Sequence, residues 1–218
     1  MASTKLIIIR HGETEQNRNN ILQGAIDTQL SELGLFQAEK VAQRLKDEKI
    51  DVLVSSHLQR AVKTAEAIAR QNTYFQENKD QILVDKAFRE ISYGVMDGRN
   101  RNEIFDDKRL LLGALDQYNF KYENGESIRD VHLRIKRALK KLLKEHEGKT
   151  IAIVTHGMTK RTMIMELLAQ SLTDVLKHMF RNTAVSMFTL QKTPEDKRPY
   201  GSVVTEVFNC AKHTEEID

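Results

Sequence analysis

Short apolar runs alternate along the chain with longer segments in which apolar residues recur at helical spacing. The runs at Leu6–Ile9 and within Asp51–Ser56 are rich in β-branched residues and lack polar alternation. Runs of this kind predict strands that are buried on both faces of a sheet. We predict strands over residues 6–9, 51–56, 81–85, 149–155, 184–191 and 202–209.

Segments with helical spacing follow several of these runs. Ser31 and Glu32 give one of them a start signal, and its apolar residues then keep the spacing of a helix face. The opening order of strand, helix, strand, helix predicts an α/β fold with a largely parallel sheet. The last two strands, joined by a loop that holds both prolines, are predicted to form an antiparallel edge pair. Helices are predicted over residues 31–45, 57–71, 99–112, 126–147 and 158–170, and loops over 13–28, 72–80, 88–99 and 116–125.

Length and composition indicate an ordinary soluble domain. We take residues 1–218 as one domain that ends in a loose polar tail at about 210–218. The net charge of +3 comes with no dense basic run, so a nucleic-acid partner is not expected. No window approaches the ~18 apolar residues of a membrane span. Cys210 is the only cysteine, which fits a reducing, cytoplasmic compartment.

Two of the predicted strands end in the dipeptide His-Gly, at His11 and at His156. If these strands are neighbours in a parallel sheet, the two imidazoles meet at the edge where α/β sheets bind ligands. The predicted helix from Met158 would aim free N–H groups at the same point, which suits an anion. Taken singly, each histidine could instead be structural. A metal site is a further alternative, but two histidines without a third ligand make a poor zinc site.

Two arginines near these strand ends favour phosphate as the anion. Arg10 adjoins His11, and Arg60 lies in the first turns of the helix after Asp51–Ser56. Guanidinium groups hold phosphate oxygens in a fixed fork. For Arg60 alone, a solvated helix face is the alternative.

Glu90 is the best carboxyl group for acid–base work. It lies in the segment FREISYG, with aromatic neighbours at Phe88 and Tyr93. A partly buried carboxyl can hold a proton for a leaving group. A surface ion pair with Arg89 is the alternative.

Five blocks of sequence, in chain order, resemble the histidine phosphatase superfamily, also called the phosphoglycerate mutase-like family. The blocks are RHGETEQN, VSSHLQRAVKTAE, FREISYG, NGES and VTHG, and the resemblance covers roughly Lys5 to Phe208. It implies a three-layer α/β/α sandwich with a mostly parallel central sheet. It also implies a small phosphorylated substrate, a histidine that attacks the phosphoryl group, and no metal ion or other cofactor.

The resemblance implies a role for each matching residue. His11 would be the nucleophile that becomes phosphohistidine, and Glu90 would be the proton donor and later the base for water. Arg10, Arg60 and His156 would hold the phosphoryl oxygens. Further substrate contacts are implied for Asn17, Gln23, Gly24, Tyr93 and Gly157.

The segment over about 90–125 bears on the choice between the two activities of this family. A mutase shields its phosphohistidine from water under a long lid, and this segment is short, which favours a phosphatase. A phosphoglycerate mutase and a non-catalytic domain that binds a phosphorylated ligand remain alternatives. The stretch GVMDG, residues 94–98, is similar to the corresponding stretch of the TIGAR-type fructose-2,6-bisphosphatases. For the oligomeric state we expect a monomer or a homodimer. Candidates to bind a second acidic group of the substrate are Arg99, Arg101, Lys108 and Arg109.

Overall fold

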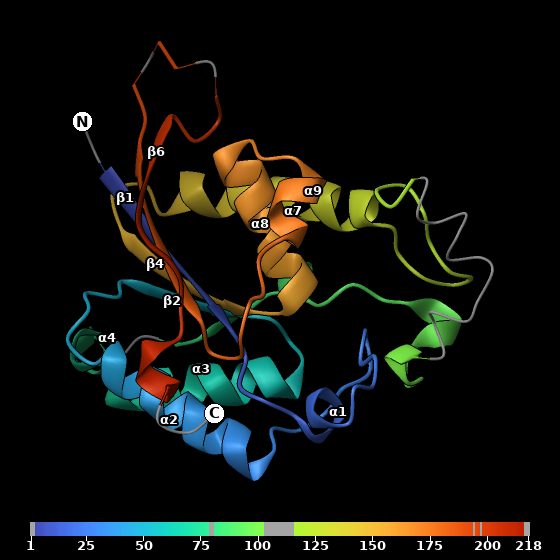
Figure 1. The fold of residues 1–218 in the computed structure, drawn as a ribbon. Helices are drawn as coiled ribbons and strands as arrows, with labels where there is room; N and C mark the ends of the chain where they lie inside the picture. The colour runs from blue at the N-terminus through green and yellow to red at the C-terminus, as the bar shows by residue number, and fades with distance from the viewer. Residues whose placement is uncertain (1–2, 79–80, 103–115, 194, 197, 216–218) are drawn as a thin grey trace.

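The fold is that of a computed structural model, which describes residues 3–78, 81–102, 116–193, 195–196 and 198–215. One six-stranded sheet lies between two layers of helices (Figure 1). The order of its strands is β3-β2-β4-β1-β5-β6. The strands from β3 to β1 are parallel to one another. β5 is antiparallel to β1, and β6 is antiparallel to β5. The expected three-layer α/β/α fold with a mostly parallel sheet is therefore confirmed.

The parallel strands carry their carboxyl ends to one edge of the sheet. β1 is a central strand because β4 and β5 flank it on either side. The last two strands pair with each other as predicted, but of the two only β6 is an edge strand, and β3 is the edge strand on the opposite side of the sheet. The strands are β1 (Ser3–Arg10), β2 (Val52–Ser55), β3 (Leu83–Val84), β4 (Thr150–Thr155), β5 (Val185–Gln191) and β6 (Ser202–Cys210).

The helices divide between the two faces of the sheet (Figure 1). One layer contains α2 (Glu32–Arg44) and α3 (Gln59–Gln71), and the other contains α7 (Ile128–Glu145), α8 (Gly157–Leu168) and α9 (Leu172–Leu176). Two short helices, α1 (Glu15–Arg18) and α4 (Thr73–Asn78), complete the described set. Within the described ranges, no helix has both the length and the apolarity to cross a bilayer.

Successive residues of β1 point to opposite faces and build two separate cores. Leu6 and Ile8 belong to the cluster under α7 and α8, whereas Ile7 and Ile9 belong to the cluster under α2 and α3. All four side chains are fully buried. The sequence of this strand is one unbroken apolar run because both of its faces are covered.

Two short helices, α1 and α4, lie where we predicted loops, and a third, α9, lies in a segment for which we predicted no element. α1, α4 and α9 span only four to six residues, too few to show an amphipathic period. Thr14 starts α1 with a capping box to Asn17, and Ser171 caps α9. The helix predicted over residues 99–112 falls mostly outside the described residues.

The described part of the C-terminal tail is attached to the domain, unlike the loose tail that we expected. Arg44 on α2 donates to the carbonyl of Cys210 at 2.9 Å. The Nε2 atom of His213 lies 3.1 Å from Oγ1 of Thr183, just before β5. Thr214 is buried. Up to residue 215 the tail is therefore anchored by polar contacts, which its polar sequence alone does not show.

The turn after β1 depends on a close approach between two glycines. A Cβ atom on Gly12 would lie 2.4 Å from the carbonyl oxygen of Gly34, in the first turn of α2. A Cβ atom on Gly34 would lie 1.9 Å from the carbonyl oxygen of Glu13. Both distances are far below van der Waals contact. The backbone around His11 can therefore take its position only because α2 has no side chain at this point.

Replacing Gly34 with alanine should destabilise the protein and displace the turn that carries His11. We expect the free energy of unfolding to fall by about 1–3 kcal/mol, the usual cost of overpacking. Urea denaturation measures the change, with Leu35→Ala as the control because Leu35 is half exposed on the same helix. Equal midpoints for G34A and the unmodified protein would contradict this account of the turn.

Candidate active site

The carboxyl ends of β1 and β4 bring two imidazole rings together. These strands are parallel neighbours, with Arg10 opposite Thr155. The N–H of His11 donates to the carbonyl of Thr155 at 2.9 Å and so extends the ladder past the strand. The ring centroids of His11 and His156 are 5.1 Å apart, and both residues are buried. The predicted meeting of the two His-Gly strand ends is confirmed.

His11 is held as a neutral imidazole with one nitrogen free. Its Nδ1 lies 2.6 Å from the carbonyl oxygen of Gly12. Because a carbonyl can only accept, Nδ1 carries the proton and Nε2 keeps its lone pair. Burial lowers the pKa of His11 well below its ordinary value, and Arg60 and Arg10 lower it further. The uncharged ring is therefore the form present at neutral pH.

Arg60 binds backbone carbonyls and an imidazole instead of a carboxylate. Its guanidinium donates to the carbonyl of Ile26 at 2.7 Å and to that of Gly24 at 2.9 Å. Its Nε donates to Nδ1 of His156 at 3.2 Å. Burial lowers the pKa of Arg60 to about 10, which still leaves it protonated at neutral pH. Its positive charge is available to the cavity that it lines.

Arg10 presents an unsatisfied donor to the same cavity. Its NH1 donates to the carbonyl of Phe180 at 2.5 Å, whereas its Nε is buried and has no hydrogen-bond partner among the described residues. Burial lowers the pKa of Arg10 to about 10. A buried donor without an acceptor costs free energy, so an oxyanion in the cavity would be stabilised here.

His156 lies behind His11 and is not part of the cavity wall. Its Nδ1 accepts from Arg60, and its Nε2 lies 2.8 Å from Oγ of Ser56. Both ring nitrogens are therefore engaged, and a contact with a phosphoryl oxygen would require one of these bonds to break. The direct phosphoryl contact of His156 therefore stays a prediction. Ser56, which the sequence analysis did not single out, orients the ring.

The carboxylate of Glu90 occupies the N-terminus of α8. Oε2 accepts from the N–H of Met158, and Oε1 accepts from the N–H of Thr159, both at 3.1 Å. We expected these N–H groups to bind the substrate anion, and this was wrong because Glu90 already takes them. Arg134 on α7 donates to the backbone carbonyl of Glu90 at 3.2 Å from the other side. Glu90 is thus held both at its side-chain carboxylate and at its backbone carbonyl.

A cavity of about 460 Å³ collects most of the predicted site residues. Tyr93 and Gly157 lie in its wall, and so does Arg101, one of the candidates for a second acidic group. Arg99 is exposed and does not line the cavity, and Lys108 and Arg109 lie outside the described residues. The other predicted residues in the wall are Arg10, His11, Asn17, Gln23, Gly24, Arg60 and Glu90.

Asn17 and Gln23 each have one half of their side-chain amide engaged. Oδ1 of Asn17 accepts from the side chain of Asn182 at 3.3 Å, and Oε1 of Gln23 accepts from the hydroxyl of Thr28 at 2.5 Å. Their amide NH2 groups are left to donate. Both side chains therefore suit the binding of an anion.

The stretch GVMDG fastens two loops of the cavity to each other. Asp97 accepts from the N–H of Tyr93 at 2.9 Å and from the N–H of Ala25 at 3.2 Å. Gly94 has a φ of 58°, and a Cβ atom there would lie 2.0 Å from the carbonyl oxygen of Glu123. Only glycine suits that position.

Sequence reasoning missed two features of the cavity. Arg161 lines it from α8, one turn after Gly157. Its spacing of four residues from a glycine at a strand end was the available signal, since such residues share a helix face. An apolar wall of Leu176, Met179 and Phe180 comes from the segment between α8 and β5. Nothing in that segment's sequence connects it with the strand ends.

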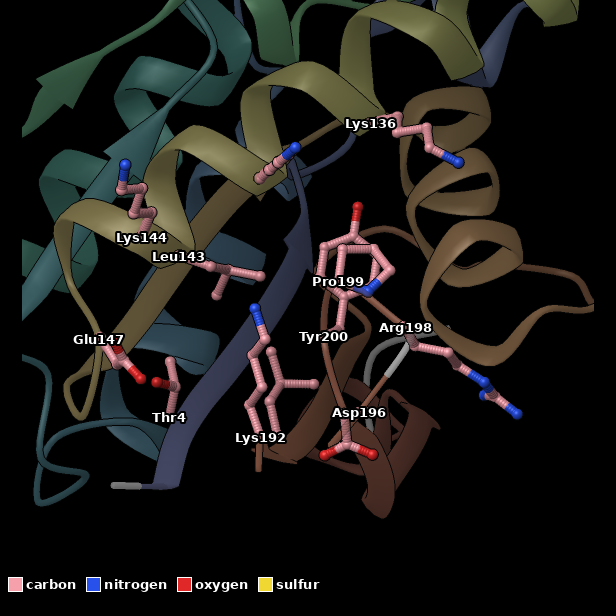
Figure 2. Close-up of a pocket in the computed structure, with 12 residues that line it drawn as sticks. Thr4, Lys136, Leu143, Lys144, Glu147, Lys192, Asp196, Arg198, Pro199 and Tyr200 are labelled. Atoms are coloured by element: carbon pink, nitrogen blue, oxygen red, sulfur yellow. The ribbon is translucent and has the colours of Figure 1, made fainter. Parts of the chain in front are cut away.

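A second hollow, of about 500 Å³, lies between α7 and the loop that joins β5 to β6. Figure 2 shows Lys144, Lys192 and Arg198 around it, with Tyr200 from the same loop. No histidine is among its described lining residues. The chemistry that phosphoryl transfer requires lies instead in the cavity above His11.

The two buried histidines should stay neutral at a pH at which free histidine is charged. Their lowered pKa values, caused first by burial and then by the nearby arginines, mean that both rings stay neutral at the pH near 6.5 at which free histidine is half protonated. Nitrogen NMR on ¹⁵N-histidine-labelled protein should show the Nδ1–H tautomer for His11 and the Nε2–H tautomer for His156 at this pH. A titration of either ring with a midpoint near the free value would refute this electrostatic description.

The family model described as "Histidine phosphatase superfamily (branch 1)" matches residues 6–197. Phosphoserine phosphatase 1 of Hydrogenobacter thermophilus is 30% identical over 190 residues, which cover 86% of this chain and 87% of that protein. Fructose-2,6-bisphosphatase TIGAR B of Danio rerio is 36% identical over 153 residues, which cover 67% of this chain and 57% of that protein. Proteins with phosphoglycerate mutase names are also among the relatives.

Solved structures agree with the sequence relatives. The phosphoserine phosphatase of Entamoeba histolytica, solved as a mutant in complex with phosphoserine, superposes with a TM-score of 0.80 at 32% identity. The alignment covers 96% of this chain and 98% of that one. The same enzyme has also been solved with 3-phosphoglyceric acid. The family match over most of the chain, together with the neutral histidine among buried arginines, establishes that this chain belongs to the histidine phosphatase superfamily.

Proposed function

We propose that the protein is a phosphatase that hydrolyses small phosphorylated metabolites through a phosphohistidine on His11. The observation that carries this proposal is the free Nε2 of a neutral His11 beside the unpartnered Nε of Arg10. A lone pair and an anion-binding donor then face one cavity. This is what nucleophilic attack on a phosphate monoester requires.

In the first step, Nε2 of His11 attacks phosphorus while the bond from phosphorus to the ester oxygen breaks. The ester oxygen takes a proton from the carboxyl of Glu90 and leaves as an alcohol. Arg10 and Arg60 stabilise the charge on the phosphoryl oxygens by position and by electrostatics. Asn17 and Gln23 add neutral donors.

In the second step, water attacks the phosphohistidine. The carboxylate of Glu90 takes a proton from the water, the bond between nitrogen and phosphorus breaks, and His11 is restored with inorganic phosphate as product. His156 acts indirectly in this scheme, because its hydrogen bonds to Arg60 and Ser56 keep the guanidinium in place.

The setting of the reaction follows from the same features. We propose a small phosphorylated molecule as the only partner that the reaction needs, and a cytoplasmic location, which the single cysteine supports. The oligomeric state, monomer or homodimer, stays a prediction.

Replacing His11 with asparagine should abolish catalysis because it removes the nucleophile. We expect phosphate release from sugar phosphates, phosphoglycerates and phosphoserine, assayed with EDTA present, to fall by at least about 1,000-fold. Acid-labile phosphate trapped on the protein should disappear as well. His146→Asn, at the end of α7 and away from the cavity, is the matched control.

Two other outcomes of that assay would point to the alternative functions. Interconversion of monophosphoglycerates faster than phosphate release would identify a mutase. Phosphate release that is unchanged in H11N, or absent from the unmodified protein while the phosphorylated ligands still bind, would remove the phosphatase proposal. The second pattern would favour a domain that only binds phosphorylated ligands.

Replacing Glu90 with glutamine should slow phosphoenzyme formation most for poor leaving groups. An alkyl phosphate needs the proton of Glu90, whereas a nitrophenyl phosphate does not. Loss of general acid catalysis costs about 100-fold or more, and we expect that loss for the alkyl ester only. Rapid-quench measurement of the two esters tests this, with Glu145→Gln on α7 as the control. Equal slowing of both esters would show that Glu90 is not the acid.

A further inference from the structure

Arg161 has an unsatisfied donor in the cavity that the proposed reaction leaves without a role. It lies on α8, where NH1 is 3.4 Å from the carbonyl of Gly157 and NH2 donates to the carbonyl of His178 at 3.0 Å. Its guanidinium carbon lies 5.2 Å from the ring centroid of Phe180. Its Nε is buried and has no hydrogen-bond partner in the part of the chain that the structure describes. NH1 and NH2 are therefore anchored to backbone carbonyls, whereas Nε still lacks an acceptor.

The position of Arg161 relative to Glu90 indicates which part of a substrate it meets. A Cβ atom placed on Gly157 would lie 3.6 Å from NH1 of Arg161, 3.6 Å from Oε2 of Glu90 and 3.8 Å from Nε of Arg10. Arg161 and the proposed acid thus flank one small space. Because the acid must reach the ester oxygen, Arg161 lies next to the atoms bonded to that oxygen, on the leaving-group side.

Positive charge predominates in the cavity wall. Arg101 and Arg161 line it in addition to Arg10 and Arg60, and Glu90 is the only acid in the described part of the wall. Both oxygens of Glu90 are already bound to N–H groups of α8. The remainder includes the apolar side chains of Leu176 and Met179. A negative group on the leaving alcohol finds a partner here, whereas an ammonium group finds repulsion.

We propose that Arg161 is a specificity-determining residue that binds a carboxylate on the leaving group, so that the preferred substrates are phosphorylated hydroxy acids without a neighbouring amine. This inference rests on the proposed phosphatase function. It separates two ligands that are otherwise alike, because 3-phosphoglycerate carries a hydroxyl where phosphoserine carries an ammonium. Arg161 and Arg101 attract the carboxylate of both, but only phosphoserine places a cation beside them.

The test compares 3-phosphoglycerate with glycerol 1-phosphate, in which a hydroxymethyl group replaces the carboxylate. In the unmodified protein kcat/KM should be highest for 3-phosphoglycerate, lower for phosphoserine and lower for glycerol 1-phosphate. Arg161→Gln should lower kcat/KM for 3-phosphoglycerate about 10- to 100-fold, the usual loss for a hydrogen bond to a charged group. It should change the value for glycerol 1-phosphate by less than about 3-fold, well under one such bond.

Two further variants keep the result interpretable. Arg161→Lys retains the charge without the fork and should recover part of the preference for the carboxylate. Arg137→Gln, on the exposed face of α7, should leave all three substrates unchanged. If R161Q does not fold, the substrate order of the unmodified protein and the R161K ratio decide the matter.

Equal losses for the two esters in R161Q would overturn the inference and make Arg161 a third phosphoryl-binding cation. An unmodified protein that hydrolyses glycerol 1-phosphate or phosphoserine as well as 3-phosphoglycerate would also overturn it, with the phosphatase proposal intact. No phosphate release from any ester would instead overturn the phosphatase proposal, and this inference with it.

Discussion

The site depends on burying arginine side chains without giving them carboxylate partners. Arg60 donates to the carbonyls of Gly24 and Ile26, and Arg10 donates to that of Phe180. Carbonyl dipoles stabilise a guanidinium without cancelling its charge. Burial is the main reason that His11 is neutral, and the charge of the two arginines lowers its pKa further and remains available to a phosphate. An ion pair at either arginine would hold the residue in place equally well but would remove the attraction for the substrate.

Backbone groups hold Glu90 as well, and its charge still acts on Arg10 and Arg60, whose pKa values it raises against the larger effect of burial. Its carboxylate binds the first N–H groups of α8, and Arg134 holds its backbone from α7. Glu126 accepts from Arg134 at 3.1 Å and from the N–H of Ser92 at 3.1 Å, so it ties the loop to the helix. The acid is therefore fixed by the helical layer, while the nucleophile is fixed by the sheet. The distance between Glu90 and His11 therefore depends on how α8 packs on β4.

The lowered pKa of a fully buried lysine reflects both its burial and the positive charge of the arginines near it. Lys160 donates to the carbonyl of Ala184 at 2.6 Å and lies 5.2 Å from the ring centroid of Phe180. Burial, and then Arg10, Arg44 and Arg161, lower its pKa well below the ordinary value. The lysine thus adds less charge around His11 than its residue type suggests. As with the arginines, a backbone carbonyl is its partner.

The sequence by itself determined the strands and the two His-Gly strand ends, because strand periodicity and residues next to a strand end are local properties. Together with the family resemblance it indicated ten of the fifteen described residues of the cavity wall. Tertiary structure decided what each polar atom binds. Ser56 and Arg60 take both nitrogens of His156, and Glu90 takes the N–H groups of α8 that were expected to be free. Arg161 reaches the site only because α8 packs against β1 and its first turns line the cavity. Such pairings join residues up to a hundred positions apart, and only the packing of the layers brings them within hydrogen-bond distance.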